Sequence, residues 1–217
     1  MKIAVLGGTG KEGSGLAMRW AAKGHEVVIG SRDAAKAQKV ADELNLALGA
    51  AGPAIAGADN LTAAQNADIA VLTVPYAAHV DTLNSVKAAL QGKVLVDVTV
   101  PVNTADFTRV SVPPGGSAAK EAQALLGSGV HVVAAFQNIS STHLKKLSSM
   151  IDCDVLVCGD NDEAKKQVFK LVEDASMRGW DAGPIDNAGV VEGLTPILLG
   201  INKRHKIKGA GIRITGL

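Results

Sequence analysis

The sequence predicts an α/β protein with a doubly wound, mostly parallel sheet and a small C-terminal extension. Short apolar segments recur along the 217 residues with helix-forming stretches between them, which is typical of parallel strands buried on both faces. Hydrophobic residues make up 47% of the chain and aromatic residues only 3%, a balance that fits a compact α/β protein. Directly after the first apolar segment the chain becomes rich in glycine, as it does where such a sheet binds a nucleotide.

The apolar segments predict six strands, at residues 2–6, 26–30, 69–74, 93–97, 131–135 and 155–158. The stretches that follow them have the Ala, Leu, Lys and Arg content of helices, which are expected at residues 13–23, 34–47, 77–90, 117–126 and 163–176. The acidic turn 160–163 favours the start of the last helix. After Gly179 the composition changes, and the apolar stretch 190–201 precedes a basic end.

Charge and hydropathy exclude several classes of partner. The 22 Lys+Arg and 21 Asp+Glu residues leave a formal net charge of +1, so nothing favours nucleic acid binding. No apolar run reaches the roughly 18–20 residues of a membrane helix, and the start turns glycine-rich too early for a signal peptide. Cys153 and Cys158 are expected about 16 Å apart along one strand, too far for a disulfide. A cytoplasmic protein that binds small molecules is therefore expected.

The glycine-rich loop has the G-x-G-x-x-G spacing of dinucleotide-binding proteins, and it lies between a strand and a helix. Its residues are Gly8, Thr9, Gly10, Lys11, Glu12 and Gly13. Gly8 is expected to allow a tight turn, Gly10 the approach of a pyrophosphate, and Gly13 the contact of helix with strand. The helix N-terminus would face the phosphates with free N–H groups. The loop therefore predicts a Rossmann dinucleotide site.

The end of the second strand favours NADP over NAD. NAD sites usually place an acidic residue there, whereas this chain has Ser31 and Arg32, which can bind a 2′-phosphate. Lys36 is expected to complete the phosphate site with Thr9 of the first loop. Asp33 is interpreted as an N-cap or first-turn acid of the next helix, because it could otherwise serve a ribose hydroxyl.

The fourth strand ends at Thr73, Val74 and Pro75, which are expected to border the nicotinamide half of the cofactor. His79 is interpreted either as a cofactor contact or as a surface residue. No nucleophile with its base is apparent, and no cluster of His, Cys, Asp and Glu has the spacing of metal ligands. We therefore expect no catalytic side chain and no metal. A protein that holds two redox rings face to face needs neither.

Six segments of the chain together resemble the family of coenzyme F420-dependent NADP reductases. They are LGGTG at residues 6–10, GSR at 30–32, TVP at 73–75, DAGP at 181–184, EGLTP at 192–196 and KIKGAGI at 206–212. The resemblance implies reversible hydride transfer between NADP(H) and the deazaflavin coenzyme F420, in a homodimer without metal. It also implies that residues 1–138 form the NADP-binding Rossmann domain. Residues 139–217 would then contribute to the F420 cleft and to a dimer contact.

By the same resemblance, the deazaflavin lies over the nicotinamide, beside the loop that follows Ala135 and contains Gln137. Members of this family carry His where this chain has Gln137. Glutamine can hydrogen-bond a ring carbonyl, but it supplies neither charge nor proton, which favours an orienting role. The basic residues of the C-terminal end would attract the anionic tail of F420, or are a solvated surface. The stretch 190–201 is expected to form an intersubunit or interdomain helix, with a core helix as the alternative.

Two other functions fit the same residues. One is an NADP-dependent reductase of a flavin, an imine or a metal ion bound in the same cleft. The other is a non-catalytic NADP sensor, which the absence of an acid–base residue would allow.

Overall fold

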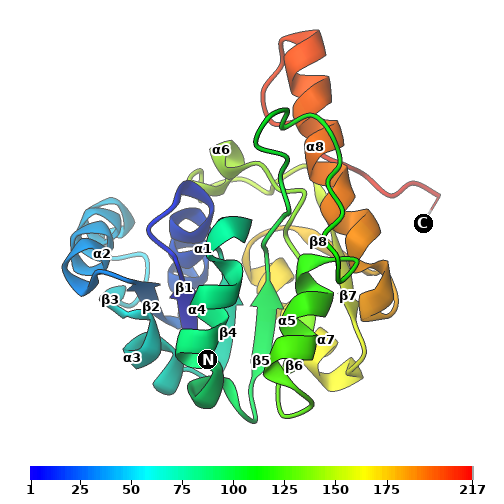
Figure 1. The fold of residues 1–217 in the computed structure, drawn as a ribbon. Helices are drawn as coiled ribbons and strands as arrows, with labels where there is room; N and C mark the ends of the chain where they lie inside the picture. Colours follow the sequence, from blue (N-terminus) through cyan, green and yellow to red (C-terminus); the bar gives the residue numbers. More distant parts are fainter. Residues whose placement is uncertain (217) are drawn as a thin grey trace.

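The computed structural model describes residues 1–216 and arranges them as an eight-stranded sheet flanked by helices (Figure 1). The strands are β1 (Lys2–Leu6), β2 (Glu26–Ser31), β3 (Ala56–Asp59), β4 (Ile69–Leu72), β5 (Val94–Asp97), β6 (His131–Ala134), β7 (Asp154–Gly159) and β8 (Arg178–Asp181). The helices are α1 (Lys11–Ala22), α2 (Ala34–Leu48), α3 (Asn60–Gln65), α4 (His79–Val86), α5 (Ala118–Leu126), α6 (Ser141–Leu144), α7 (Asp162–Asp174) and α8 (Ala188–His205).

The sheet has the strand order β3-β2-β1-β4-β5-β6-β7-β8. The six strands from β3 to β6 are parallel, β7 runs antiparallel to β6, and β8 is parallel to β7. The winding direction changes between β1 and β4, where an open sheet leaves a crevice at the carboxyl ends of its strands. The predicted doubly wound, mostly parallel sheet is thus confirmed.

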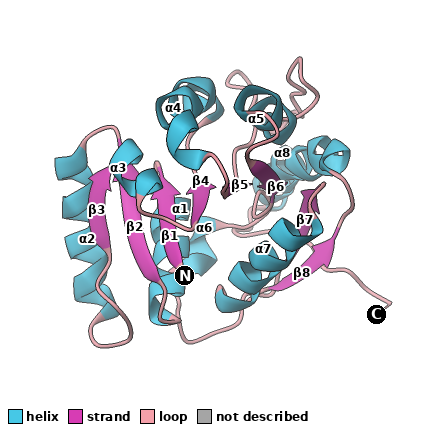
Figure 2. Cartoon of the chain, turned by 90° about the horizontal axis from the view of Figure 1, so that it is seen from below, coloured by secondary structure: helices cyan, strands magenta, loops and turns pink. Residues whose placement is uncertain are grey.

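Each face of the sheet buries its own aliphatic core. Alternate side chains of a strand point to opposite faces, so that Ile3 and Val5 join one core and Ala4 and Leu6 the other. Figure 2 shows α1 and α7 on one side of the sheet and α4 and α5 on the other. The two cores contain few aromatic residues, and their packing depends on Val, Leu, Ile and Ala.

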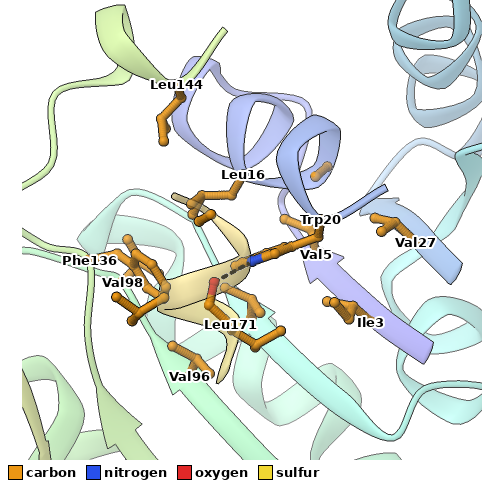
Figure 3. Packing of buried hydrophobic residues seen from close by; sticks show 14 of the residues in the cluster. Ile3, Val5, Leu16, Trp20, Val27, Val96, Val98, Phe136, Leu144 and Leu171 are labelled. Atoms are coloured by element: carbon orange, nitrogen blue, oxygen red, sulfur yellow. Dashed lines mark hydrogen bonds between the residues drawn. The ribbon is translucent and has the colours of Figure 1, made fainter. Parts of the chain in front are cut away.

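Trp20 of α1 is the largest side chain in the first core (Figure 3). Its ring meets that of Phe136 edge-on, with centroids 5.9 Å apart, and its Nε1 donates to the carbonyl of Leu171 at 2.9 Å. The bond satisfies the indole N–H inside the core, as a buried tryptophan requires. It also connects α1 to α7, which lie far apart in the sequence.

Arg19 connects the same helix to the segment after β6. The side chain is only 2% exposed, and within residues 1–216 it forms no ion pair with a carboxylate. Its donors instead reach five backbone carbonyls: Leu144 at 2.8 Å, Lys146 at 2.6 Å, Ala175 at 3.0 Å, His143 at 3.1 Å and Ser149 at 3.4 Å. Five charge-assisted contacts compensate for the burial of this cation and fix the course of residues 143–149.

The structure corrects several of the predicted elements. Four elements were not predicted: strand β3, helix α3, helix α6 and strand β8. The expected helix 77–90 is divided into the α-helix α4 and two flanking 3₁₀ turns, Tyr76–Ala78 and Lys87–Leu90. The stretch 190–201 does lie in one helix, α8. Cys158 lies in β7, and Cys153 lies one residue before the start of that strand. Both are buried free thiols.

Candidate functional site

A cavity of about 630 Å³ lies at the carboxyl ends of the parallel strands. One wall is the glycine loop after β1 with the residues after β2, and the floor is formed by the loops after β4, β5 and β6. The opposite wall comes from α8, through Thr195, Leu198, Leu199 and Asn202, and from Ala210 of the following segment. In Figure 1, α8 and the loop after β5 rise beyond the strand ends and extend this side of the molecule.

The glycine loop has the shape that phosphate binding requires. A Cβ added to Gly10 would meet no protein atom within 4 Å, which leaves this part of the cavity open to a ligand. A Cβ added to Gly13 would lie 2.5 Å from Oγ1 of Thr73, the residue directly after β4, so only glycine permits this close approach of α1. Gly7, which was not among the predicted residues, has the left-handed φ of +69°. Thr9, Lys11 and Glu12 line the cavity with Gly10 and Gly13.

Ser31 at the end of β2 lines the cavity together with Arg32 and Lys36. The carboxylate of Asp33 is engaged elsewhere and does not bind the ligand. Its carboxylate caps α2 by accepting from Ala35 N at 3.0 Å and Lys36 N at 3.2 Å, which confirms the predicted N-cap. Ser31 Oγ accepts from Asp33 N at 3.2 Å and keeps its own proton free to donate. Arg32 and Lys36 are exposed, and within residues 1–216 neither side chain forms an ion pair.

Thr73, Val74 and Pro75 line the cavity, whereas His79 lies behind it. His79 is fully buried, and its Nε2 is 2.7 Å from Asp97 Oδ2, so it is neither a cofactor contact nor a surface residue. Burial lowers the pKa of His79, but the hydrogen bond and the charge of Asp97 outweigh this effect and raise it. Asp97 also accepts from Thr99 N at 2.9 Å, which fixes the loop after β5.

Gln137 lines the cavity with its amide orientation determined by the fold. Its Nε2 donates to the Asp97 carbonyl at 2.8 Å, while its Oε1 is buried without a hydrogen-bond partner in the described chain. The adjacent Asn138 repeats this arrangement, since its Nδ2 donates to the Asp154 carbonyl at 2.8 Å and its Oδ1 has no partner. Each amide nitrogen thus donates inside the protein, and each amide oxygen is a buried acceptor without a partner in the described chain. An amide nitrogen carries two N–H groups, so the bond to Asp97 uses one of the two donors of Gln137.

Two polar side chains, Glu192 and Thr195, join helix α8 to the Rossmann core. Glu192, 3% exposed, accepts from Ala118 N at 2.9 Å and Ala119 N at 3.1 Å, and Thr195 Oγ1 donates to the Gln137 carbonyl at 2.7 Å. Burial raises the pKa of Glu192 to about 7, although the two amides of α5 oppose this shift. The cavity wall on α8 thus depends on a buried carboxyl one turn before Thr195.

Most of the predicted binding residues meet at this cavity. Gly8 and Ala135 do not line it; Gly8 N donates to Val5 O and Gly30 O in the turn, and Ala135 is fully buried. Ser140 and α8 lie within residues 139–217, which were expected to contribute to the cleft, whereas sequence reasoning missed Asn60, whose Oδ1 accepts from Gly7 N at 3.1 Å, and Thr99. These residues lie outside any local motif, although EGLTP at residues 192–196 marked the right helix.

Among residues 1–216, no group of three or more His, Cys, Asp or Glu side chains could hold a metal ion. In the same part of the chain, no helix combines the length and the apolar character needed to cross a membrane.

Comparison with known proteins finds relatives of the whole chain. Residues 2–101 match the family model described as NADP oxidoreductase, coenzyme F420-dependent. A protein from Methanothermobacter marburgensis named F420-dependent NADP reductase is 42% identical, over 100% of this chain and 99% of that protein. A protein of the same name from Methanocaldococcus jannaschii is 41% identical, again over 100% and 99%.

Solved structures agree with the fold. A crystal structure from Arthrobacter sp. FB24, provisionally described as an F420-dependent NADP-reductase, has a TM-score of 0.82 at 25% identity and covers 100% of both chains. A pyrroline-5-carboxylate reductase from Coxiella burnetii has a TM-score of 0.64 at 16% identity, over 94% of this chain and 68% of that one. The second likeness concerns the fold alone.

Proposed function

Because the chain belongs to the family of coenzyme F420-dependent NADP oxidoreductases, we propose that it transfers a hydride reversibly between NADP(H) and the deazaflavin F420. The observation that carries this proposal is a single cavity that extends from the glycine loop to α8. One end has the features of a dinucleotide site, and the other end is lined by Gln137, Thr195 and Leu198. The site therefore has separate walls for two redox molecules.

NADP fits the residues at the first end. The backbone of Gly10 would approach the pyrophosphate, since a Cβ at this position would occupy empty space. Thr9, Ser31, Arg32 and Lys36 would bind the 2′-phosphate, because they provide hydroxyl and cationic donors without a competing carboxylate. Thr73, Val74 and Pro75 would border the nicotinamide.

F420 would occupy the second end, between Gln137 and α8, where it supplies the ring carbon that exchanges the hydride. The acceptor Oε1 of Gln137 suits an N–H group of that ring or of the nicotinamide carboxamide, after a small movement that exposes this buried atom. The basic residues in the last turn of α8 and beyond it would attract the anionic tail of F420: Lys203, Arg204, His205, Lys206, Lys208 and Arg213. The protein's contribution is orientation of the two molecules and exclusion of water.

Mixing the purified protein with NADPH and oxidised F420 tests this function. Loss of the deazaflavin absorbance, with one NADPH consumed for each F420, is the expected result. Reduction of a flavin with no change in F420 would instead assign the NADPH-dependent flavin reductase activity. Tight NADPH binding without turnover on F420, flavin or imine would point to an NADP sensor.

Three further features belong to the same proposal. The protein acts as a homodimer in the cytoplasm, and residues 139–217 form a smaller part that contributes to the F420 cleft and the dimer contact. The outer face of α8 supports the dimer, because Val190 is 74% exposed and Ile197 45% exposed. Val110, 47% exposed, lies beside this helix at Gly193 and extends the apolar surface.

A further inference from the structure

A carboxyl group lies inside the loop that is proposed to hold the pyrophosphate. Glu12 is in the first turn of α1, between Gly10 and Gly13, and its side chain lines the cavity. An ionised carboxylate at this position would repel the bound phosphates and would offer them no donor. The presence of Glu12 therefore requires a physical explanation within the proposed function.

The surroundings of Glu12 disfavour its charge. Glu12 as a whole is half-buried, and its Oε1 is fully buried and has no hydrogen-bond partner in the described chain. On α1, Glu12 shares a face with Leu16 and Arg19, which lie four and seven residues further along. The guanidinium of Arg19 is occupied by backbone carbonyls and does not pair with it.

The other charged groups around the cavity also leave Glu12 unpaired. The cations that line the cavity are Lys11 on its own helix and Arg32 and Lys36 on the neighbouring wall, while the titratable His143 lies outside the cavity on α6, the helix packed against α1. Within residues 1–216, none of them forms an ion pair with Glu12. A carboxyl group that is desolvated and unpaired holds its proton more tightly than one in water.

We propose that Glu12 is protonated when the dinucleotide is bound, so that it donates to the cofactor and couples NADP binding to proton uptake. This inference rests on the proposed function, since it takes NADP as the ligand. The neutral acid removes the repulsion between carboxylate and phosphate, and its O–H group adds a donor to the loop. Deprotonated Glu12 would bind a proton from solvent as the cofactor enters.

The direction of the pH effect follows from the free protein. Burial alone raises the pKa of Glu12 to about 8, and bound phosphates would raise it further. At neutral pH the acid is already mostly protonated, so that binding takes up little proton. Above pH 8 the free protein carries the carboxylate, and the affinity for NADP falls as the pH rises.

Isothermal titration with NADP⁺ alone, at pH 7.5 and pH 9 in buffers of different ionisation enthalpy, tests the proposal without F420. For a free pKa of about 8, the wild-type affinity is expected to fall about eightfold between these pH values. Proton uptake is expected to approach one per NADP⁺ at pH 9. The variant Glu12→Gln, which keeps the shape and a donor, should bind with nearly constant affinity and take up no proton.

Glu43→Gln is the matched control, because it makes the same change on the exposed surface of α2, outside the cavity. It should retain the wild-type pH dependence. A wild-type affinity that does not change between pH 7.5 and 9, or an equal decrease in Glu12→Gln, would overturn the inference. Failure of NADP⁺ to bind at pH 7.5 would instead contradict the proposed function.

Discussion

At the scale of single residues, the choice of cofactor depends on a division of roles after β2. Asp33 is the residue best placed to serve a ribose hydroxyl, and its carboxylate is engaged in capping α2. Arg32, its neighbour, has no ion-pair partner within residues 1–216 and borders the cavity. A phosphate that entered here would meet a free guanidinium and no competing acceptor, which is the arrangement that selects NADP.

Replacing Arg32 by alanine should weaken the binding of NADP selectively. A charge-assisted contact contributes roughly 1.5–3 kcal/mol, so that the KM for NADP is expected to rise about 10- to 150-fold. The KM for F420 should change little, because Arg32 lies on the opposite wall. Steady-state kinetics with each substrate varied in turn measure both constants. Lys39→Ala, on the exposed surface of α2, is the control. Equal increases in both constants would contradict the assignment.

Glu192 gives a second prediction at this scale. Its pKa is raised from 4.5 to about 7, so the folded protein binds this proton more tightly than the unfolded chain does. The resulting stabilisation is present below pH 4.5 and is lost as the pH rises to 7, a change on the order of 3 kcal/mol. Urea unfolding of wild type and Glu192→Gln at pH 5 and pH 7.5 measures it. The stability difference, wild type minus variant, should decrease at the higher pH. A constant difference would argue against the shift.

At the scale of elements, the sequence predicted the strands and helices that have a strong hydrophobic pattern. It missed the elements whose position depends on tertiary contacts. Strand β3 reads Ala-Gly-Ala-Asp and lacks β-branched residues, and Gly57 is required because a side chain would collide with the backbone of Gln38. Strand β8 has a similarly weak pattern. The glycine loop and Arg32 could be found because they are continuous in the chain, whereas Asn60 and Thr99 reach the site only through the fold.

A substitution of Arg19 tests whether this single cation holds residues 143–149, the segment after β6, in place. Its replacement by methionine keeps much of the apolar volume but leaves buried carbonyls without donors. The free energy of unfolding should therefore decrease by about 3 kcal/mol or more. Urea denaturation followed by circular dichroism measures the loss. Arg204→Met, on the exposed end of α8, should change the stability by less than about 0.5 kcal/mol. A loss that small for Arg19→Met would show that the segment folds without these contacts.

At the scale of the whole molecule, the apolar outer face of α8 bears on the oligomeric state. The double variant Val190→Asp, Ile197→Asp should convert a dimer of twice 22.1 kDa into monomers, because two charges would be buried in the proposed contact. Light scattering after size-exclusion chromatography measures the mass. Leu46→Asp, at a position 86% exposed on α2, should leave the dimer intact. An unchanged mass in the double variant would place the contact elsewhere.

The pairing between β6 and β7 is very short, since it joins only Val133 with Gly159 and Ala134 with Cys158. The last two strands are therefore held to the parallel part mainly by side chains, among them Trp20 and Arg19, which reach across to α7 and its end. Such a joint can loosen locally while the parallel strands remain paired. In deuterium exchange, the amides of β7 and β8 should consequently form a separate, faster cooperative unit than those of β1 and β4.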